Sequence, residues 1–145
     1  MHYEGTIDAT VPKEKFYEFI SDPSRIITII PGVEQTRIND SDHFFVKANV
    51  GAGPLRGSIG MNFTLAEKRK DTSAKLVGHG EGMQGFVDLT LVVNLEDVPR
   101  GSRAGWSADV RVGGLLTSVA GRLIEGIAGS YIEQITENLR KRVTN

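Results

Sequence analysis

The stretch Gly114–Arg142, GLLTSVAGRLIEGIAGSYIEQITENLRKR, sets how the rest of this 145-residue chain must be arranged. Charged side chains recur on one side and apolar ones on the other at a spacing close to 3.6, which predicts a long amphipathic helix. At a rise of 1.5 Å per residue this helix would span about 40 Å. Its first half is small and apolar nearly all round, so we expect this half to be the more enclosed one. The apolar face comprises Ala120, Leu123, Ile124, Ile127, Tyr131, Ile135 and Leu139.

Two glycines, Gly126 and Gly129, lie inside this expected helix. Each weakens a helix by about 1 kcal/mol relative to alanine, so each needs a reason. Two interpretations are open. The glycines either let neighbouring strands approach closely or leave room for a ligand.

Upstream of the helix, short segments alternate between apolar and polar residues, which is typical of half-buried strands. Two short helices are expected after the first strand: one opens at Val11-Pro12 and ends at Asp22-Pro23, and a second covers Pro23 to Ile30. Regular spacing and short turns predict an antiparallel meander that only the long helix can cover. The expected strands are His2–Ala9, Glu34–Ile38, Phe44–Val50, Ser58–Glu67, Thr72–Glu81, Gly85–Glu96 and Ser102–Val112.

The sequence therefore predicts an α+β fold: a curved antiparallel sheet of about seven strands around a long C-terminal helix, with two short helices after strand 1. A chain of 145 residues without a linker-like segment is expected to form one domain over residues 1–145.

The opening of this domain is predicted from glycine and proline. Gly51–Gly57 is expected to be a mobile loop, which with Pro31-Gly32 would form the mouth, and Leu55 would act as its lid. The isoleucines between these segments and the first strand exceed what one narrow helix face can bury. Either the domain covers both faces of their helix, or one face borders an opening. These residues are Ile26, Ile27, Ile29 and Ile30.

Composition excludes several function classes. The net charge of −1 gives no electrostatic basis for nucleic-acid binding. There are no cysteines, and His2, His43 and His79 lack metal-ligand spacing, so we expect no metal and no cofactor. No apolar run approaches the roughly 20 residues of a membrane span and no signal peptide opens the chain, so a cytoplasmic protein is expected.

The parity of the strands places ionisable groups outside. Lys47, Lys75, His79, Glu81, Asp88, Glu96, Arg103, Asp109 and Arg111 all fall on the polar face of their strands. A general acid or base must lie within hydrogen-bond reach of the substrate, so the interior offers no catalytic residue that we can name.

A glycine stripe marks the inner face of one strand, because Gly78, Gly80 and Gly82 share one parity over about 13 Å. Glycine within a strand indicates a bend or a close approach by something else. The stripe is explained either by a sheet curved tightly around the helix or by an internal cavity, and the two are compatible. The candidate ligand-binding residues are Ile30, Pro31, Pro54, Leu55, Met61, Phe63, Gly78, Gly80, Met83, Leu89, Leu91, Trp106, Leu116, Ala120, Leu123, Ile127 and Tyr131.

Several motifs resemble those of the G-subunit family of carbon monoxide dehydrogenase, a branch of the START-like (helix-grip, SRPBCC) superfamily. The similarity covers nearly the whole chain, and the Pro-Gly-Val-Glu element is the most specific part. The motifs are VPKEKFYEFISDP at Val11–Pro23, IPGVE at Ile30–Glu34, VGAGPLRG at Val50–Gly57, GHGEG at Gly78–Gly82 and VGGLLTSVAGRLI at Val112–Ile124.

This resemblance implies a seven-stranded sheet gripping the last helix around a hydrophobic cavity. It also implies an accessory role beside a molybdenum hydroxylase-type dehydrogenase, with a quinone or lipid-like molecule as ligand. Some relatives carry a C-terminal membrane-associating tail. Because this sequence stops soon after Arg140-Lys141-Arg142, we expect at most peripheral membrane contact.

Three functions follow as hypotheses. The first is a non-catalytic binder of a lipophilic small molecule that acts as carrier or accessory protein. The second is a cyclase- or aromatase-like enzyme, for which Tyr3, Tyr131, Thr117 and Ser118 are the polar candidates. The third is a protein-interaction subunit whose interior is filled by its own side chains.

Overall fold

Seven strands form one antiparallel sheet in the computed structural model, which describes residues 1–114 and 121–143. The order across the sheet is β1-β7-β6-β5-β4-β3-β2, so each strand from β2 onward pairs with its successor and the first strand pairs with the last. This confirms the predicted meander. The strands are β1 (His2–Ala9), β2 (Val33–Ile38), β3 (His43–Ala52), β4 (Leu55–Arg69), β5 (Ser73–Gly82), β6 (Gly85–Val98) and β7 (Gly101–Gly114).

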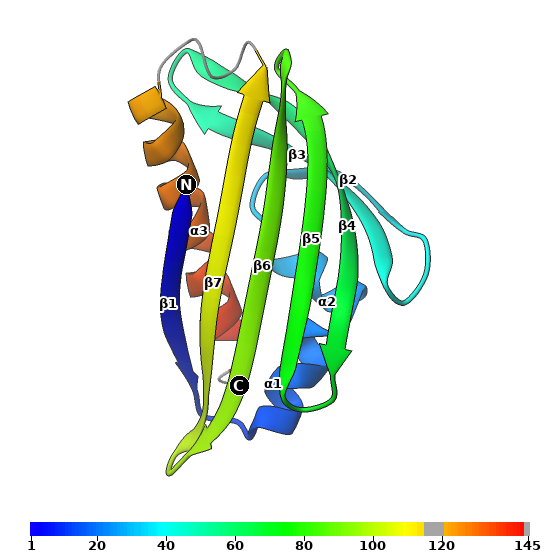
Figure 1. Cartoon of the computed structure of the whole chain (residues 1–145), viewed down its shortest axis with the longest axis vertical. Coiled ribbons are helices and arrows are strands. Elements are labelled where there is room, and N and C mark those ends of the chain that lie inside the picture. The colour runs from blue at the N-terminus through cyan, green and yellow to red at the C-terminus, as the bar shows by residue number, and fades with distance from the viewer. Residues whose placement is uncertain (115–120, 144–145) are drawn as a thin grey trace.

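All helices cover one face of this curved sheet, with α3 behind β1 and β7 in the view of Figure 1. The short helices begin where the sequence predicts: Pro23 occupies the first turn of α2, and the Asp22 carboxylate caps it by accepting a 2.9 Å hydrogen bond from the Ser24 amide. The predicted start of the long helix, residues 115–120, lies outside the described residues. The helices are α1 (Lys13–Ile20), α2 (Pro23–Ile26), the 3-10 helix η1 (Ile27–Ile29) and α3 (Gly121–Val143).

The core is concentrated at the α1 end of the sheet. Phe16 is completely buried there, among the end of β1, the start of β7 and the last turns of α3. A second cluster lies under β3 and β4, where the rings of Phe44 and Phe63 stack with centroids 5.0 Å apart. The end of the sheet near the β3–β4 hairpin is packed less fully, and this end holds the cavity described below.

The enclosure of α3 runs opposite to the sequence-based expectation. Val143, at the C-terminal end, is 5% exposed and belongs to the main core, whereas Glu125 and Gly126 near the other end are exposed. The small apolar residues of the first half border hollow space instead of packed side chains. Amphipathic spacing identified the inner face of this helix but not which part of it would be packed.

The predicted mobile loop Gly51–Gly57 is instead a tight hairpin. β3 continues to Ala52, β4 starts at Leu55, and these two residues pair directly. Gly53 makes the reversal with a φ of +56°, which glycine adopts without strain. In Figure 1 this hairpin bends across the top of the molecule toward the first turns of α3.

Candidate ligand-binding cavity

An apolar cavity of about 310 Å³ lies between the inner face of the sheet and α3. Its volume falls at the lower end of the range of roughly 300–1,000 Å³ typical of small-molecule sites. The strands contribute Val46, Ala48, Val50, Ile59, Met61, Phe63, Leu76, Val87, Leu89, Leu91, Val110 and Val112. The helices and turns contribute Ile26, Ile29, Ile30, Gly51, Leu55, Met83, Ile124, Ile127, Ala128, Tyr131, Ile132 and Ile135.

Local periodicity explains how these residues come together. On each strand the lining residues alternate with outward ones, because successive side chains of a strand point to opposite faces. On α3 they follow spacings of three and four residues, which place them on one side of a helix. Each strand and helix therefore supplies one apolar face, and the curvature of the sheet keeps these faces apart.

Many of the predicted site residues lie on this lining: Ile30, Leu55, Met61, Phe63, Met83, Leu89, Leu91, Ile127 and Tyr131. Pro31 and Leu123 line an adjoining hollow, and Pro54 is exposed in the β3–β4 turn. Leu116 and Ala120 lie outside the described residues.

The glycine stripe of β5 is covered by side chains and does not face the void. A Cβ added at Gly78 would lie 2.9 Å from the Phe63 ring, and one at Gly80 would collide with the Met61 sulfur. The prediction that Gly78 and Gly80 line the cavity directly is corrected accordingly. These glycines seat Met61 and Phe63, whose side chains form the wall.

Trp106 also lies elsewhere than predicted. Its indole packs against the main core cluster, over Gly5 of β1, where an added Cβ would be 3.0 Å from the ring. Gly5 and Trp106 are register partners, so the missing side chain on β1 makes room for the indole. Parity placed Trp106 on the correct face, but it fills the sheet's edge instead of lining the cavity.

Sequence reasoning missed much of the lining, although the signal was present. Val46, Ala48 and Val50 share the parity of buried Phe44 on β3, and Val110 and Val112 share one parity on β7. The isoleucine cluster is also resolved: the segment that contains it borders the void. Its lining members are Ile26, Ile29 and Ile30.

A second hollow of about 450 Å³, here called the vestibule, lies between α3 and the β3–β4 hairpin. It adjoins the cavity, because Val50, Gly51, Ile127 and Tyr131 line both. Unlike the cavity it carries polar side chains. Its other lining residues are Pro31, Gly32, Asn49, Ala52, Arg56, Leu123, Gly126, Ser130 and Gln134.

Tyr131 stands at the junction of cavity and vestibule. Its hydroxyl donates a 2.6 Å hydrogen bond to the backbone carbonyl of Pro31, and burial raises its pKa to about 12. The phenol is therefore a neutral donor throughout the physiological range. Further along the helix, the Asn138 amide donates a 3.0 Å hydrogen bond to the Ile29 carbonyl, so two side chains tie α3 to this segment.

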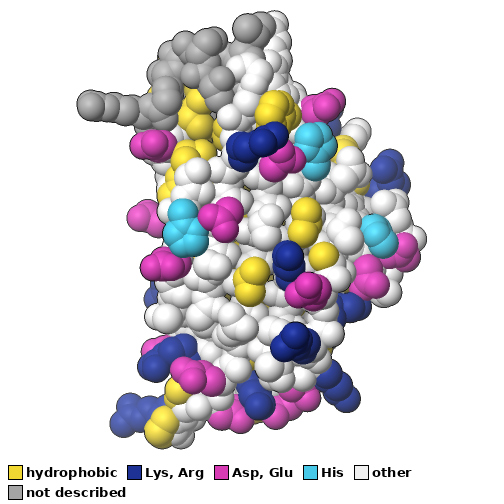
Figure 2. Space-filling view, viewed as in Figure 1, with side chains coloured by type: hydrophobic (Ala, Val, Ile, Leu, Met, Phe, Trp, Pro, Cys, Tyr) yellow, Lys and Arg dark blue, Asp and Glu magenta, His cyan; other side chains and the backbone are white. Residues whose placement is uncertain are grey.

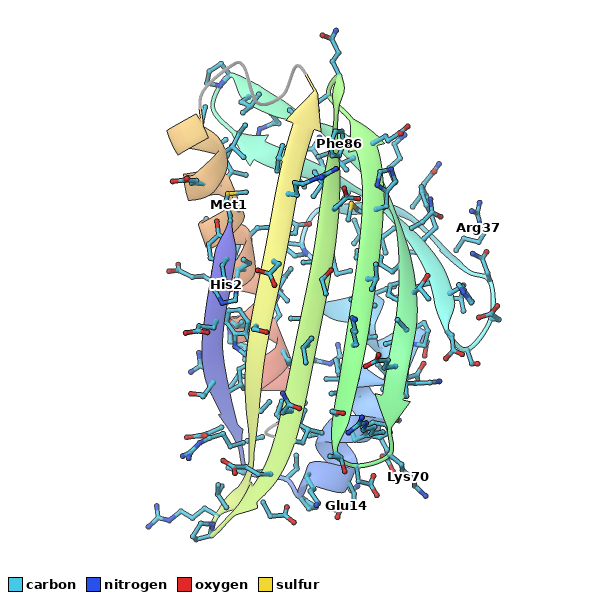
Figure 3. The ribbon with its side chains drawn as sticks, viewed as in Figure 1. Met1, His2, Glu14, Arg37, Lys70 and Phe86 are labelled. Carbon is cyan, nitrogen blue, oxygen red and sulfur yellow. The ribbon has the colours of Figure 1, made fainter. Side chains whose placement is uncertain are left out.

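Ionisable groups lie on the outer face of the sheet, as the parity predicted (Figure 2). His79 Nδ1 lies 2.5 Å from a carboxylate oxygen of Asp88, and this hydrogen bond is the main reason why the pKa of His79 is raised. In Figure 3 the labelled side chains of Arg37 and Lys70 project away from the sheet. Among the described residues, the cavity lining contains no carboxylate, imidazole or amine.

Metal-binding and membrane-spanning features are absent from residues 1–114 and 121–143. No three histidine, cysteine or acidic side chains in these ranges lie together so that they could hold a metal ion. Within the same ranges, no helix is long and apolar enough to cross a membrane.

Known proteins match both the sequence and the fold. The sequence model of the family described as the G subunit of carbon monoxide dehydrogenase (CoxG) matches residues 5–144. A conserved protein from Geobacillus kaustophilus superposes with a TM-score of 0.86 at 20% identity, covering 99% of this chain and 95% of its own. No curated protein gives a significant match.

Two more distant structures share the fold. A START superfamily protein from Mycobacterium smegmatis has a TM-score of 0.70 at 13% identity, covering 98% of this chain and 96% of its own. The di-domain ARO/CYC BexL from the BE-7585A biosynthetic pathway has a TM-score of 0.66 at 10% identity, covering 100% of this chain and 50% of its own.

Proposed function

This chain belongs to the CoxG family of carbon monoxide dehydrogenase, and we propose that it binds a lipophilic small molecule, lipid- or quinone-like, in its cavity. The observation that carries the proposal is an apolar void of about 310 Å³ beside a well-packed core. Unfilled apolar volume lowers stability, because the lining side chains lose contacts that the void cannot return. A lipophilic molecule would restore those contacts and remove its own apolar surface from water, at about 25 cal/mol per Å².

An enzyme of the cyclase or aromatase type is less well supported. Acid–base catalysis needs a titratable group within reach of the substrate, and the described lining offers only the Tyr131 hydroxyl, which is already bonded to Pro31. The Tyr3 hydroxyl lies 3.4 Å from the Glu125 carbonyl. Thr117 and Ser118, the other polar candidates, lie outside the described residues.

A pure interaction subunit with a filled interior is also less well supported, since the described side chains leave the void open. Family membership supports a partner all the same. We propose that the protein serves as carrier or accessory factor to a molybdenum hydroxylase-type dehydrogenase, in the cytoplasm and with at most peripheral membrane contact.

The proposal is tested on freshly purified protein. Native mass spectrometry combined with solvent extraction should reveal a co-purified apolar molecule in one-to-one ratio. Delipidated protein should then bind the neutral fluorescent lipophile N-phenyl-1-naphthylamine saturably. Absence of any extractable molecule together with a non-saturable fluorescence response would overturn the proposal.

A further inference from the structure

We propose that the cavity and the vestibule form one site for a single-chain amphiphile with an anionic head, and that Arg56 binds this head. The apolar chain occupies the cavity and the head lies in the vestibule. This inference rests on the proposed function and specifies the class of ligand.

The continuity of the two hollows is the first step. Val50 and Gly51 of β3 and Ile127 and Tyr131 of α3 line both spaces. A molecule that fills the cavity can therefore extend past Tyr131 without crossing a wall. The polarity changes at this boundary, because the vestibule adds the side chains of Asn49, Ser130 and Gln134. An apolar cavity that opens into a polar one matches a molecule with an apolar chain and a polar head.

The sign of the head follows from charge. Arg56 is the one charged residue among the described residues that line the vestibule. It forms no ion pair or hydrogen bond with the described part of the chain, so its five donors are available. A guanidinium pairs well with carboxylate or phosphate, because its planar fork matches two oxygens. A phosphate head and a carboxylate head share this chemistry.

The size of the cavity restricts the tail. A volume of about 310 Å³ is small for a ligand site, and Met61, Phe63 and Leu89 close it on the sheet side. Such a space suits one slender chain or a compact apolar group better than the paired chains of a membrane phospholipid. Tyr131 marks the depth at which the apolar part ends, since its hydroxyl and the Pro31 carbonyl are the polar groups at the junction.

The experiment compares two ligands that differ only in their heads, decanoate and decanol, by isothermal titration on delipidated protein. Wild type should bind both, with decanoate the tighter. Arg56→Gln should weaken decanoate binding about threefold to tenfold, the range for one charge-assisted contact near the surface, and leave decanol binding unchanged. Raising the salt concentration should weaken only decanoate binding to wild type.

Matched controls isolate the head contact. Arg37→Gln removes the same charge from β2, where the Arg37 guanidinium lies over the Phe45 ring and projects away from the sheet (Figure 3), and should change neither affinity. Arg56→Lys keeps the charge and should recover part of the decanoate affinity. Acetate, and inorganic phosphate as a free anion, should not displace decanoate at equal concentration, because neither has a tail for the cavity.

The outcomes separate the two proposals. If decanoate and decanol bind equally and Arg56→Gln affects neither, the anionic head is refuted while the lipophilic binder stands. If phosphate binds to Arg56 as tightly as decanoate does, the site recognises a free anion and the amphiphile is refuted. If no ligand with a tail binds to any variant, the proposed function itself fails.

Discussion

The side chain of Met61 occupies the space that a side chain at Gly80 would need. The two residues are register partners on β4 and β5, and a Cβ built on Gly80 would collide with the Met61 sulfur and lie 2.8 Å from the Gly60 carbonyl oxygen. Met61 in turn lines the cavity. The glycine therefore shapes the cavity indirectly, by giving the methionine a flat seat against the sheet.

This relationship predicts that Gly80→Val is destabilising, although valine favours strands. The added methyl groups must displace Met61 and press on backbone that cannot yield easily, so the free energy of unfolding should fall by roughly 1–3 kcal/mol. Affinity for N-phenyl-1-naphthylamine should fall as well, because Met61 can move only toward the cavity. Urea melts and fluorescence titrations measure the two effects. Unchanged stability would contradict the packing of Met61 on Gly80.

Gly126→Ala is the matched control, because a Cβ at this position of α3 would meet nothing within 4 Å. The variant should gain up to about 1 kcal/mol from helix propensity. This open surrounding also excludes one interpretation of the helix glycines: no strand packs closely against Gly126 or Gly129 among the described residues.

A second prediction fills the cavity from another wall. Val110 lines it from β7, opposite Leu89 in the register of the sheet. In Val110→Phe the ring should enter the void, so the stability should change by less than about 1 kcal/mol while the affinity for N-phenyl-1-naphthylamine falls at least tenfold. The pair of measurements is a urea melt and a titration. A variant that binds the probe like wild type would place the ligand somewhere other than this cavity.

The third prediction concerns the tie between α3 and the segment before β2. Tyr131→Phe removes the hydroxyl that donates to the Pro31 carbonyl, so the free energy of unfolding should fall by about 0.5–1.5 kcal/mol. Because this contact lies between cavity and vestibule, stopped-flow measurements should show faster release of the fluorescent probe. Tyr17→Phe provides the control, since the structure gives the Tyr17 hydroxyl no hydrogen-bond partner among the described residues. Equal release rates in the two variants would argue against a gate at Tyr131.

The fourth prediction concerns pH. The hydrogen bond to Asp88, supported by Glu81, raises the pKa of His79 above 6.5, so the folded chain binds this proton more tightly than the unfolded chain does. The resulting stabilisation is complete below pH 6.5 and is lost as the pH rises through the raised pKa of the folded state. NMR titration of the His79 ring should find a raised pKa that Asp88→Asn moves back toward 6.5. An identical pKa in both proteins would contradict the pairing.

Local sequence patterns were enough to predict the strand order, the long helix and the outward placement of charge. Strand and helix periodicities are local properties, and seven alternating segments with short turns leave few ways to pair. Alternation therefore fixed the face on which residues such as Leu89 and His79 lie. The family could also be predicted, because its motifs are contiguous stretches of sequence.

The division of inward residues into those that pack and those that line a void arises from tertiary contacts alone. Trp106 and Leu89 both point inward, yet one fills the edge beside Gly5 and the other borders the cavity. Periodicity assigns a face but carries no information about sheet curvature or about the neighbour that takes up the space of a missing side chain. The contact between Tyr131 and Pro31, 100 residues apart, arises because the fold brings α3 against the segment before β2, a proximity that no local pattern encodes.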